Sequence, residues 1–314
     1  MMIDIIIPCY NAKETITETL VSLCLQINSN DLNVYLINDC SDYNYKFYID
    51  FFSNFINIQE LRTPTNAGPG GAREYGIQNS DNRYIMFMDS DDHLYTYDSV
   101  YELYQEIQKK NYDLVYSDFL YIRDNEIKIM DSDLTWLHGK IYDRTFINAK
   151  DVHFNNTRAN EDNGFNRLLL LLSNNYHHLS KTTYVYNENP NSITRRNNRE
   201  YRFTGLEGFI YNMNWAIKNA LVRGANKRLV TVLAINVLIA MYYYYLELYN
   251  EYDVKKLLEW SVPIKKFLIN NKYLNDEDYD KLIEIKRKEY NANNKFKEII
   301  TFREFIDKID EYIQ

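Results

Sequence analysis

The chain has 314 residues, of which 46% are hydrophobic and only 9 are glycine and 5 proline, so we expect an ordered globular protein. Its 36 basic and 44 acidic residues leave a formal net charge of -8, which argues against nonspecific binding to nucleic acid or to anionic lipid. The length favours one large domain with a smaller appendage.

Cysteine usage and the first residues of the chain bear on the compartment. Cys9, Cys24 and Cys40 are too few and too scattered for a disulfide framework or a zinc site, and they are typical of small buried residues in a reducing compartment. The chain starts a strand almost at once, without the basic and apolar segments of a secretory signal. We therefore expect a cytoplasmic protein.

Strands and helices alternate from the start of the chain. An apolar strand at Ile3–Ile7 is followed by apolar residues at helical spacing over Ile16–Ile27, which together make one βα unit. Further strands are predicted at Val34–Ile37 and Ile56–Leu61, and each ends in polar residues. The only glycine-rich segment, Asn66–Gly71, is predicted to be a loop that leads into a helix.

The alternation continues beyond this loop. The further elements are a strand at Tyr84–Met88, a helix at Val100–Ile107, a strand at Asp113–Ile122 with a hairpin turn at Asp124–Asn125, a helix at Glu161–Leu172 and a strand at Leu179–Tyr186. Such a pattern favours an α/β fold with a doubly wound, mostly parallel sheet and right-handed connections.

After Arg202 the pattern changes to helices only. We therefore predict an α/β domain over residues 1–202 and an all-helical C-terminal region over residues 203–314. The predicted helices are Phe209–Leu221, Leu229–Tyr249, Leu257–Ile269 and Phe296–Ile309.

One of these helices must be tested as a membrane span. Leu229–Leu246 is almost continuously apolar and about the minimum length for a span, but Tyr242–Tyr245 bring four hydroxyl groups that fit hydrocarbon poorly. A buried helix of a bundle is the favoured interpretation. Peripheral contact with a membrane, or a homodimer that covers the apolar surface, stays open.

An acidic tetrad, Asp89-Ser90-Asp91-Asp92, follows the buried strand Tyr84–Met88. Open α/β sheets bind ligands beyond the carboxyl ends of their strands, and carboxylates are the ligands that Mg²⁺ and Mn²⁺ prefer. The tetrad therefore indicates a metal-bridged, phosphorylated substrate. A solvated acidic turn that caps the next helix is the alternative.

Four motifs in a fixed order resemble the signature of the family 2 glycosyltransferases. They are Ile7–Asn11, Asn38–Asp42, Asn66 with Gly68–Arg73, and Asp89–Asp92, and the similarity continues through Trp136–Arg144, Glu161–Asp162, and Tyr186 with Asn191–Thr194. The resemblance covers about two thirds of the chain. It implies a GT-A fold, with a Rossmann-like and mostly parallel sheet, and an inverting transfer from a UDP-sugar with the help of Mn²⁺ or Mg²⁺. The acceptor is not implied.

For the nucleoside end of the donor, the resemblance implies contacts from the turn that follows the first strand. Pro8, Tyr10 and Asn11 would lie beneath the base, where the ring of Tyr10 can stack on uracil. Asp39 would accept the N3 hydrogen of uracil. Taken singly, these residues are also typical of turns and caps.

For the diphosphate, the resemblance implies a close approach of the glycine-rich segment. Asn66 and Gly70 would contact the donor, and Arg73 would contact its base or diphosphate. Arg195 opens an arginine-rich stretch that ends at Arg202, and this stretch could close as a lid on the diphosphate or on an anionic acceptor. A solvated linker is the alternative for this stretch.

The metal and the sugar are assigned to the tetrad and to one histidine. Asp91 would coordinate the ion directly, while Asp89 and Ser90 would contact ribose or act on the ion indirectly, with Asp92 behind them. His138 stands in the predicted loop Trp136–Arg144, where the resemblance implies contacts with the donor sugar or the acceptor, and it could also supply a third ligand. An isolated histidine is also often structural.

The general base is implied to be Asp162, with Glu161 binding the acceptor or orienting the segment. Without the resemblance, acidic residues in a first helical turn are more often there for the helix dipole and the cap.

Three other interpretations stay open for the whole protein. A nucleotidyltransferase that makes nucleotide sugars would use a similar sheet, glycine-rich segment and acidic cluster. A binding module could hold a nucleotide sugar or a glycan without turnover. The acceptor hydroxyl of a glycosyltransferase could belong to a glycan, to a cell-wall polymer or to modified DNA, although the overall acidity disfavours nucleic acid.

Overall fold

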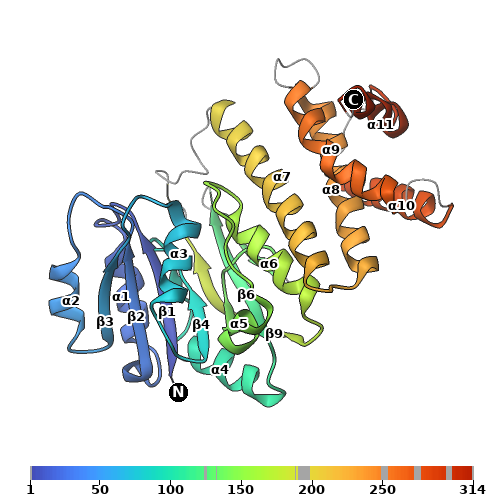
Figure 1. The fold of residues 1–314 in the computed structure, drawn as a ribbon. Helices are drawn as coiled ribbons and strands as arrows, with labels where there is room; N and C mark the ends of the chain where they lie inside the picture. Colours follow the sequence, from blue (N-terminus) through green and yellow to red (C-terminus); the bar gives the residue numbers. More distant parts are fainter. Residues whose placement is uncertain are drawn as a thin grey trace. The chain divides into compact units, whose positions relative to one another are not determined.

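The computed structural model describes residues 2–123, 126–131, 133–187, 189, 199–248, 254–271, 277–294 and 299–312. The chain divides into two compact units, Met1–Gly205 and Leu206–Gln314. Figure 1 draws the first unit in blue to green and the second in yellow to red.

Within the described residues, nine strands of the first unit form one sheet, in the order β3-β2-β1-β4-β8-β6-β9-β5, with β7 paired to β6. The strands are β1 Ile3–Cys9, β2 Leu32–Asn38, β3 Asn57–Arg62, β4 Tyr84–Phe87, β5 His93–Leu94, β6 Leu114–Arg123, β7 Glu126–Met130, β8 Lys140–Asp143 and β9 Tyr176–Tyr186. Strands β3, β2, β1 and β4 run parallel, β8 runs antiparallel to both of its neighbours, and β6 is parallel to β9. The mostly parallel α/β sheet is therefore confirmed.

Helices cover both faces of this sheet. They are α1 Ile16–Cys24, α2 Lys46–Phe52, α3 Gly68–Gln78, α4 Ser99–Lys109, α5 Arg144–Lys150 and α6 Glu161–Leu172. On one face, Ile5 of β1 belongs to the same buried cluster as Leu20 of α1 and Leu103 of α4. On the other face, α3 approaches so closely that a Cβ on Gly76 would come within 2.5 Å of Ile6 Cγ2. Alternate residues of the buried strand β1 thus pack against helices on opposite faces of the sheet.

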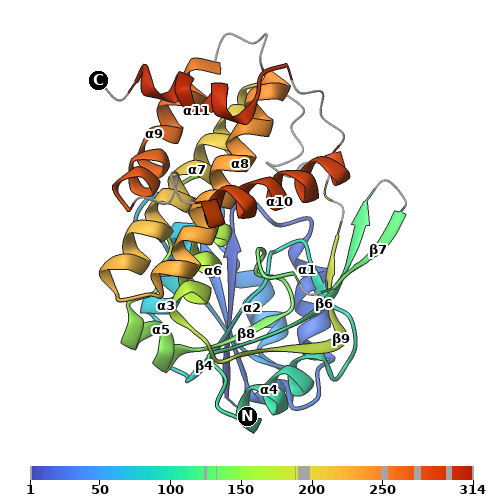
Figure 2. The same cartoon turned by 90° about the vertical axis from the view of Figure 1, so that its right-hand side faces the viewer.

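Several elements differ from the sequence prediction. The segment Gly68–Gly71 is the first turn of α3 and not a loop, and Lys140–Asp143, predicted within a loop, is β8. The sequence interpretation missed α2, α5, β5 and, in the second unit, α10 (Glu277–Asn294). The hairpin turn predicted at Asp124–Asn125 lies outside the described residues, but β6 and β7 pair antiparallel on either side of it. Figure 2 shows this hairpin extending away from the rest of the sheet.

The second unit is helical, as predicted. Its helices are α7 Arg199–Val222, which begins within the first unit, α8 Lys227–Leu248, α9 Val254–Asn270, α10 Glu277–Asn294 and α11 Phe302–Asp310. Phe296, predicted to open the last helix, lies outside the described residues. The helix α11 begins instead after Thr301, which forms a capping box with Glu304.

Among the described residues, α8 is the one helix long and apolar enough to cross a membrane, and 67% of its most apolar window is buried inside the structure. The hydroxyl of Tyr242 donates to the carbonyl of Ile300 at 2.6 Å, and that of Tyr243 donates to the carbonyl of Arg287 at 3.1 Å. Buried tyrosine hydroxyls with protein partners fit the predicted bundle helix.

A buried ion pair at the start of β1 gives a prediction about stability. Asp4 is fully buried, and its Oδ2 lies 2.8 Å from Nη2 of Arg144. Asn82 donates to the same carboxylate from its backbone amide and its side chain. We expect Arg144→Leu to lower the free energy of unfolding by about 3–5 kcal/mol, because it leaves a buried carboxylate without its cation.

Lys46→Leu is the control. The Lys46 side chain is 72% exposed and pairs at 2.7 Å with Asp50, which is 59% exposed, so its loss is expected to cost about 1 kcal/mol or less. Urea unfolding of the two variants measures the difference. Equal losses of stability would contradict the role given to the pair of Asp4 and Arg144.

Candidate functional site

A cleft of about 1230 Å³ lies in the first unit, beyond the carboxyl ends of β1, β2 and β4 and against the start of α6. Most of the residues predicted from the sequence line it: Pro8, Tyr10, Asn11, Asp39, Asn66, Arg73, Asp89, Ser90, Asp91, His138, Glu161 and Asp162. Arg195 lies outside the described residues. The structure thus brings the predicted side chains, from separate segments, to one edge of the sheet.

The turn after β1 is held to the turn after β2. Asn11 adopts a left-handed backbone with a φ of 52°, and its amide donates to Ser41 Oγ at 2.9 Å. Its side chain exchanges hydrogen bonds with Asp42. Tyr10, at the tip of this turn, is 58% exposed. One end of the cleft therefore carries an aromatic ring on a fixed turn.

Asp39 is buried where β2 ends and fixes the start of α3. Its Oδ1 accepts hydrogen bonds from Thr63 Oγ1 at 2.8 Å and from the amide of Ala67 at 2.9 Å, and its Oδ2 accepts from the amide of Gly68 at 2.8 Å. Asn66 donates to the carbonyl of Asp39. Because a carboxylate offers about four acceptor positions, three internal donors leave Asp39 the capacity for one more.

The carboxylates of the tetrad differ in their surroundings. Burial alone would raise the pKa of Asp89, but the charge of Arg73 and the contact with His138 hold it well below its usual value. Burial, helped by the charge of Asp89, raises the pKa of Asp91. The same two causes raise the pKa of Asp92 well above its usual value. Of the three carboxyl groups in the tetrad, Asp89 therefore loses its proton most readily, and its negative charge raises the pKa of the other two.

Partners from the end of β9 hold the last two carboxylates. Asp91 Oδ2 accepts a hydrogen bond from Asn189 Nδ2 at 2.7 Å. Asp92 is fully buried and accepts from the Tyr184 hydroxyl at 2.8 Å and from the amide of Asn187 at 2.9 Å. Asp91 lines the cleft, whereas Asp92 supports the loop from behind.

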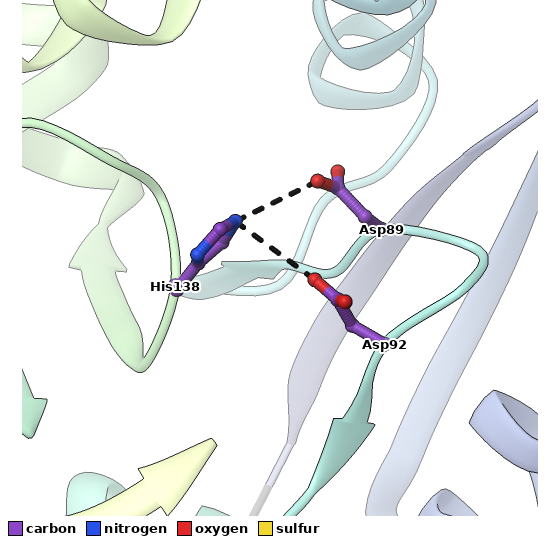
Figure 3. Close-up of side chains that lie close together, drawn as sticks. All are labelled: Asp89, Asp92 and His138. Atoms are coloured by element: carbon purple, nitrogen blue, oxygen red, sulfur yellow. Dashed lines mark ion pairs between the residues drawn. The ribbon is translucent and has the colours of Figure 1, made fainter. Parts of the chain in front are cut away.

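His138 faces two of these carboxylates (Figure 3). Its Nε2 lies 3.6 Å from Asp89 Oδ2 and 3.9 Å from Asp92 Oδ2. The ring is stacked between Tyr184 and Tyr186, with centroids 5.0 Å apart on each side, and its buried Nδ1 has no hydrogen-bond partner among the described residues. Stacking therefore fixes the imidazole so that Nε2 points toward the tetrad.

Arg73 connects the tetrad with the start of α6. It is buried, and its guanidinium donates to Glu161 Oε1 at 2.8 Å and to Asp89 Oδ1 at 2.5 Å. Burial alone would lower the pKa of Arg73, but the charges of the two carboxylates raise it. A Cβ on Gly70 would lie 2.5 Å from Glu161 Cγ, so glycine is needed there for α3 to approach α6. In this arrangement Arg73 and Gly70 organise the carboxylates, and the donor contacts predicted for them stay predictions.

Asp162 stands in the first turn of α6, at the cleft. Burial, followed by the charge of Glu161, raises the pKa of Asp162 to about 7. Its Oδ1 accepts from the amide of Asn163 at 2.7 Å, so it also satisfies one free amide of the helix start. A carboxyl group that titrates near neutral pH is suited to take up a proton.

Sequence reasoning missed several polar residues that line the cleft, among them Arg158 and Asn189. Arg158 donates from Nη1 to Asn66 Oδ1 at 2.8 Å, and it stands in an irregular segment without a motif. Asn189 follows β9 and binds Asp91. Its place just beyond the carboxyl end of a strand was a usable signal.

The family comparison covers half of the chain. Residues 4–160 match the model of the family described as Glycosyl transferase family 2. Among curated proteins, poly(ribitol-phosphate) beta-N-acetylglucosaminyltransferase TarS of Staphylococcus aureus (strain MW2) is 24% identical over 203 residues, which are 59% of this chain and 35% of that protein. The glucosyltransferase WfgD of Escherichia coli, named for UDP-Glc and alpha-D-GlcNAc-diphosphoundecaprenol, is 29% identical over 126 residues, 40% of this chain and 49% of that protein. The matches cover about a third or less of the length of the first three curated relatives.

Solved structures agree on the fold. TarS 1–349 of S. aureus in complex with UDP-GlcNAc superposes with a TM-score of 0.71 at 18% identity, covering 99% of this chain and 89% of that one. The mannosyltransferase PcManGT of Pyrobaculum calidifontis, with GDP-Man and Mn²⁺, gives a TM-score of 0.56 at 11% identity and covers 99% and 84%. The GT-A fold is therefore confirmed, and the chain belongs to glycosyltransferase family 2.

Proposed function

We propose that the chain transfers a sugar from a UDP-sugar to an acceptor hydroxyl, with inversion at the anomeric carbon. The observation that carries the proposal is Asp162, a carboxyl with a pKa of about 7 in the same cleft as the tetrad Asp89–Asp92. The structural neighbour that binds UDP-GlcNAc supports the choice of donor.

The donor would lie with its nucleoside on the side of β1 and β2. The exposed ring of Tyr10 offers a stacking surface, and the fourth acceptor position of Asp39 suits the N3 hydrogen of uracil. Arg158 and the amide of Asn66 line the cleft near this end. The diphosphate would then reach the tetrad at the end of β4.

The residues present fit a divalent cation. Ligand atoms of Asp89, Asp92 and His138 lie within 4.8 Å of one another. Two carboxylates and one imidazole are a ligand set that suits Mn²⁺. Asp92, however, is fully buried behind the cleft, whereas Asp91 lines it. We therefore assign Asp89, Asp91 and His138 as the residues that would hold Mn²⁺ or Mg²⁺, which when bound neutralises the charge on the departing diphosphate.

Asp162 would act as the general base. As a carboxylate it accepts the proton of the acceptor hydroxyl while the oxygen attacks the anomeric carbon from the face opposite UDP. A single displacement of this kind inverts the configuration and needs no covalent intermediate. Arg73 pairs with both Asp89 and Glu161. It therefore fixes the distance between the tetrad, which would hold the donor, and the start of α6, which carries the base.

UDP release from a panel of nucleotide sugars, with Mn²⁺, with Mg²⁺ and with EDTA, tests the proposal. We expect slow metal-dependent release from one or a few UDP-sugars in the absence of an acceptor. Release of pyrophosphate from a nucleoside triphosphate and a sugar phosphate would instead identify a nucleotidyltransferase. Binding of a UDP-sugar without any release would identify a binding module.

The remaining expectations for partners stay predictions. A glycan acceptor is supported by the names of the relatives, since WfgD and TarS are named for carbohydrate or polyol acceptors. Four further predictions rest on the sequence alone. They are a modified DNA acceptor, a homodimer, peripheral membrane contact and a cytoplasmic location.

A further inference from the structure

An aromatic wall closes the end of the cleft that lies away from Tyr10. It consists of Tyr121 in β6, Trp136 and Tyr186 in β9, all of which line the cleft and are partly exposed. The rings of Tyr121 and Tyr186 are parallel, with centroids 5.2 Å apart. The ring of Trp136 lies 5.8 Å from the first and 5.7 Å from the second. Tyr186 also stacks on His138, but the mechanism proposed above gives the exposed faces of these rings no ligand.

The backbone of Trp136 is fixed from two sides. Asp133 Oδ1 accepts from the amides of Thr135 at 3.0 Å and Trp136 at 2.8 Å. The fully buried Asn166 donates to the carbonyls of the same two residues at 2.8 and 2.9 Å, and it accepts from the Tyr142 hydroxyl. A side chain held this firmly at a cleft surface is pre-organised for contact with a ligand.

The hydrogen bonds of Asn166 also place the wall beside the proposed base. Asn166 follows Asp162 by four residues on α6, so the two side chains lie on one face of the helix about 5–6 Å apart at Cβ. Trp136, bound to Asn166 through its carbonyl, therefore stands about one helical turn from Asp162. An acceptor whose hydroxyl meets Asp162 would extend onto this wall.

Sheet order separates the wall from the nucleoside end. Tyr10 and Asp39 follow β1 and β2, and the tetrad follows β4. Tyr121 and Tyr186 stand toward the carboxyl ends of β6 and β9, which β8 separates from β4 in the sheet. With neighbouring strands about 4.8 Å apart, the wall lies on the β9 side of the cleft, next to His138 and away from the ends of β1 and β2.

Charge also limits what the wall can bind. Of the described residues that line the cleft, the cations are Arg73 and Arg158. Arg73 is engaged by Asp89 and Glu161, and Arg158 lies against Asn66 at the other end. The donor diphosphate is assigned to the ion at the tetrad, whereas the aromatic wall favours a neutral acceptor over a phosphorylated one.

We propose that Tyr121, Trp136 and Tyr186 bind the acceptor, and that this acceptor presents the apolar C–H face of a neutral pyranose ring. The inference rests on the proposed function, and it departs from the poly(ribitol-phosphate) for which the TarS relative is named. Aromatic rings bury the hydrocarbon face of a sugar while the ring hydroxyls stay free for polar contacts.

The test uses the full chain with the UDP-sugar that the panel identifies, and with methyl pyranosides or ribitol 5-phosphate as acceptors. We expect pyranosides to stimulate UDP release more than ribitol 5-phosphate does. Trp136→Ala and Tyr121→Ala should raise the KM for the pyranoside at least about fivefold. Trp136→Phe should restore most of the loss. The KM for the UDP-sugar should stay near the wild-type value in Tyr121→Ala and in Trp136→Phe, which keeps an aromatic ring beside His138.

Tyr97→Ala is the control, because Tyr97 is 66% exposed and does not line the cleft. Saturation-transfer NMR of methyl pyranoside binding gives a readout that needs no turnover. Binding that is present in the wild type and lost in Trp136→Ala supports the wall even if no UDP is released, in which case the proposed function alone fails. Absence of pyranoside binding, preference for ribitol 5-phosphate, or a raised KM for the donor alone would overturn the inference.

Discussion

Asp162→Asn is expected to lower the rate of sugar transfer by about 100- to 10,000-fold, the range for loss of a general base. The amide cannot take up the proton of the acceptor hydroxyl. UDP affinity should stay close to that of the wild type, because Asp162 lies at the start of α6 and the donor is assigned to the ends of β1, β2 and β4. Turnover and UDP binding by calorimetry are measured on the same preparation.

The pH dependence follows from the raised pKa of Asp162. A general base works only as the carboxylate, and burial together with the charge of Glu161 raises its pKa to about 7. Transfer should therefore rise about tenfold per pH unit below pH 7 and level off above it. The residual activity of Asp162→Asn should not show this rise with pH below pH 7.

Asp50→Asn is the control for the change of one negative charge. Asp50 stands on α2 with a 2.7 Å ion pair to Lys46, and both side chains are largely exposed. It should leave turnover and its pH profile unchanged. An Asp162→Asn variant that lost UDP binding and transfer to the same extent would not fit a general base.

Asp91→Asn is expected to abolish metal-dependent binding of UDP. Asp91 is the tetrad carboxylate that lines the cleft without an ion pair to Arg73, and a neutral amide holds a divalent ion far less well. Removing an outer partner of a metal ligand already costs about 10- to 100-fold in affinity, so loss of a ligand should cost at least as much. Calorimetry of UDP with Mn²⁺ and with EDTA measures the effect.

The wild type should bind UDP more weakly in EDTA than in Mn²⁺, whereas Asp91→Asn should bind it equally weakly in both. Asp50→Asn again serves as the control. An Asp91→Asn variant that kept its Mn²⁺-dependent affinity, together with an Asp92→Asn variant that lost it, would move the ion to the cluster of Asp89, Asp92 and His138.

Much of the fold could be predicted because strong local patterns carry it. Strand β1 is apolar on both faces, and α6 follows its apolar spacing from Glu161 to Leu172. By contrast, β8 has only four residues and includes Lys140, so no periodicity marks it. The glycines of Gly68–Gly71 are poor helix formers, and among them Gly70 lets the first turn of α3 pack closely on Glu161 of α6.

The site could be predicted where its acidic residues directly follow a strand or stand in the first turn of a helix. Asp39, the tetrad residues Asp89–Asp91 and Asp162 stand at such positions, and all line the cleft. The bridge that Arg73 forms to Asp89 and Glu161 was not predictable, because it depends on how closely α3 approaches α6 at Gly70. The stacking of His138 depends likewise on the register of β9.

Structure determination of the protein in crystals grown with UDP and Mn²⁺ tests the central claim most directly. The account predicts uracil between Tyr10 and Asp39, the ion on Asp91, and the terminal phosphate on the side of the cleft that faces Asp162. A nucleotide bound outside this cleft, or a diphosphate directed away from the tetrad, would contradict it.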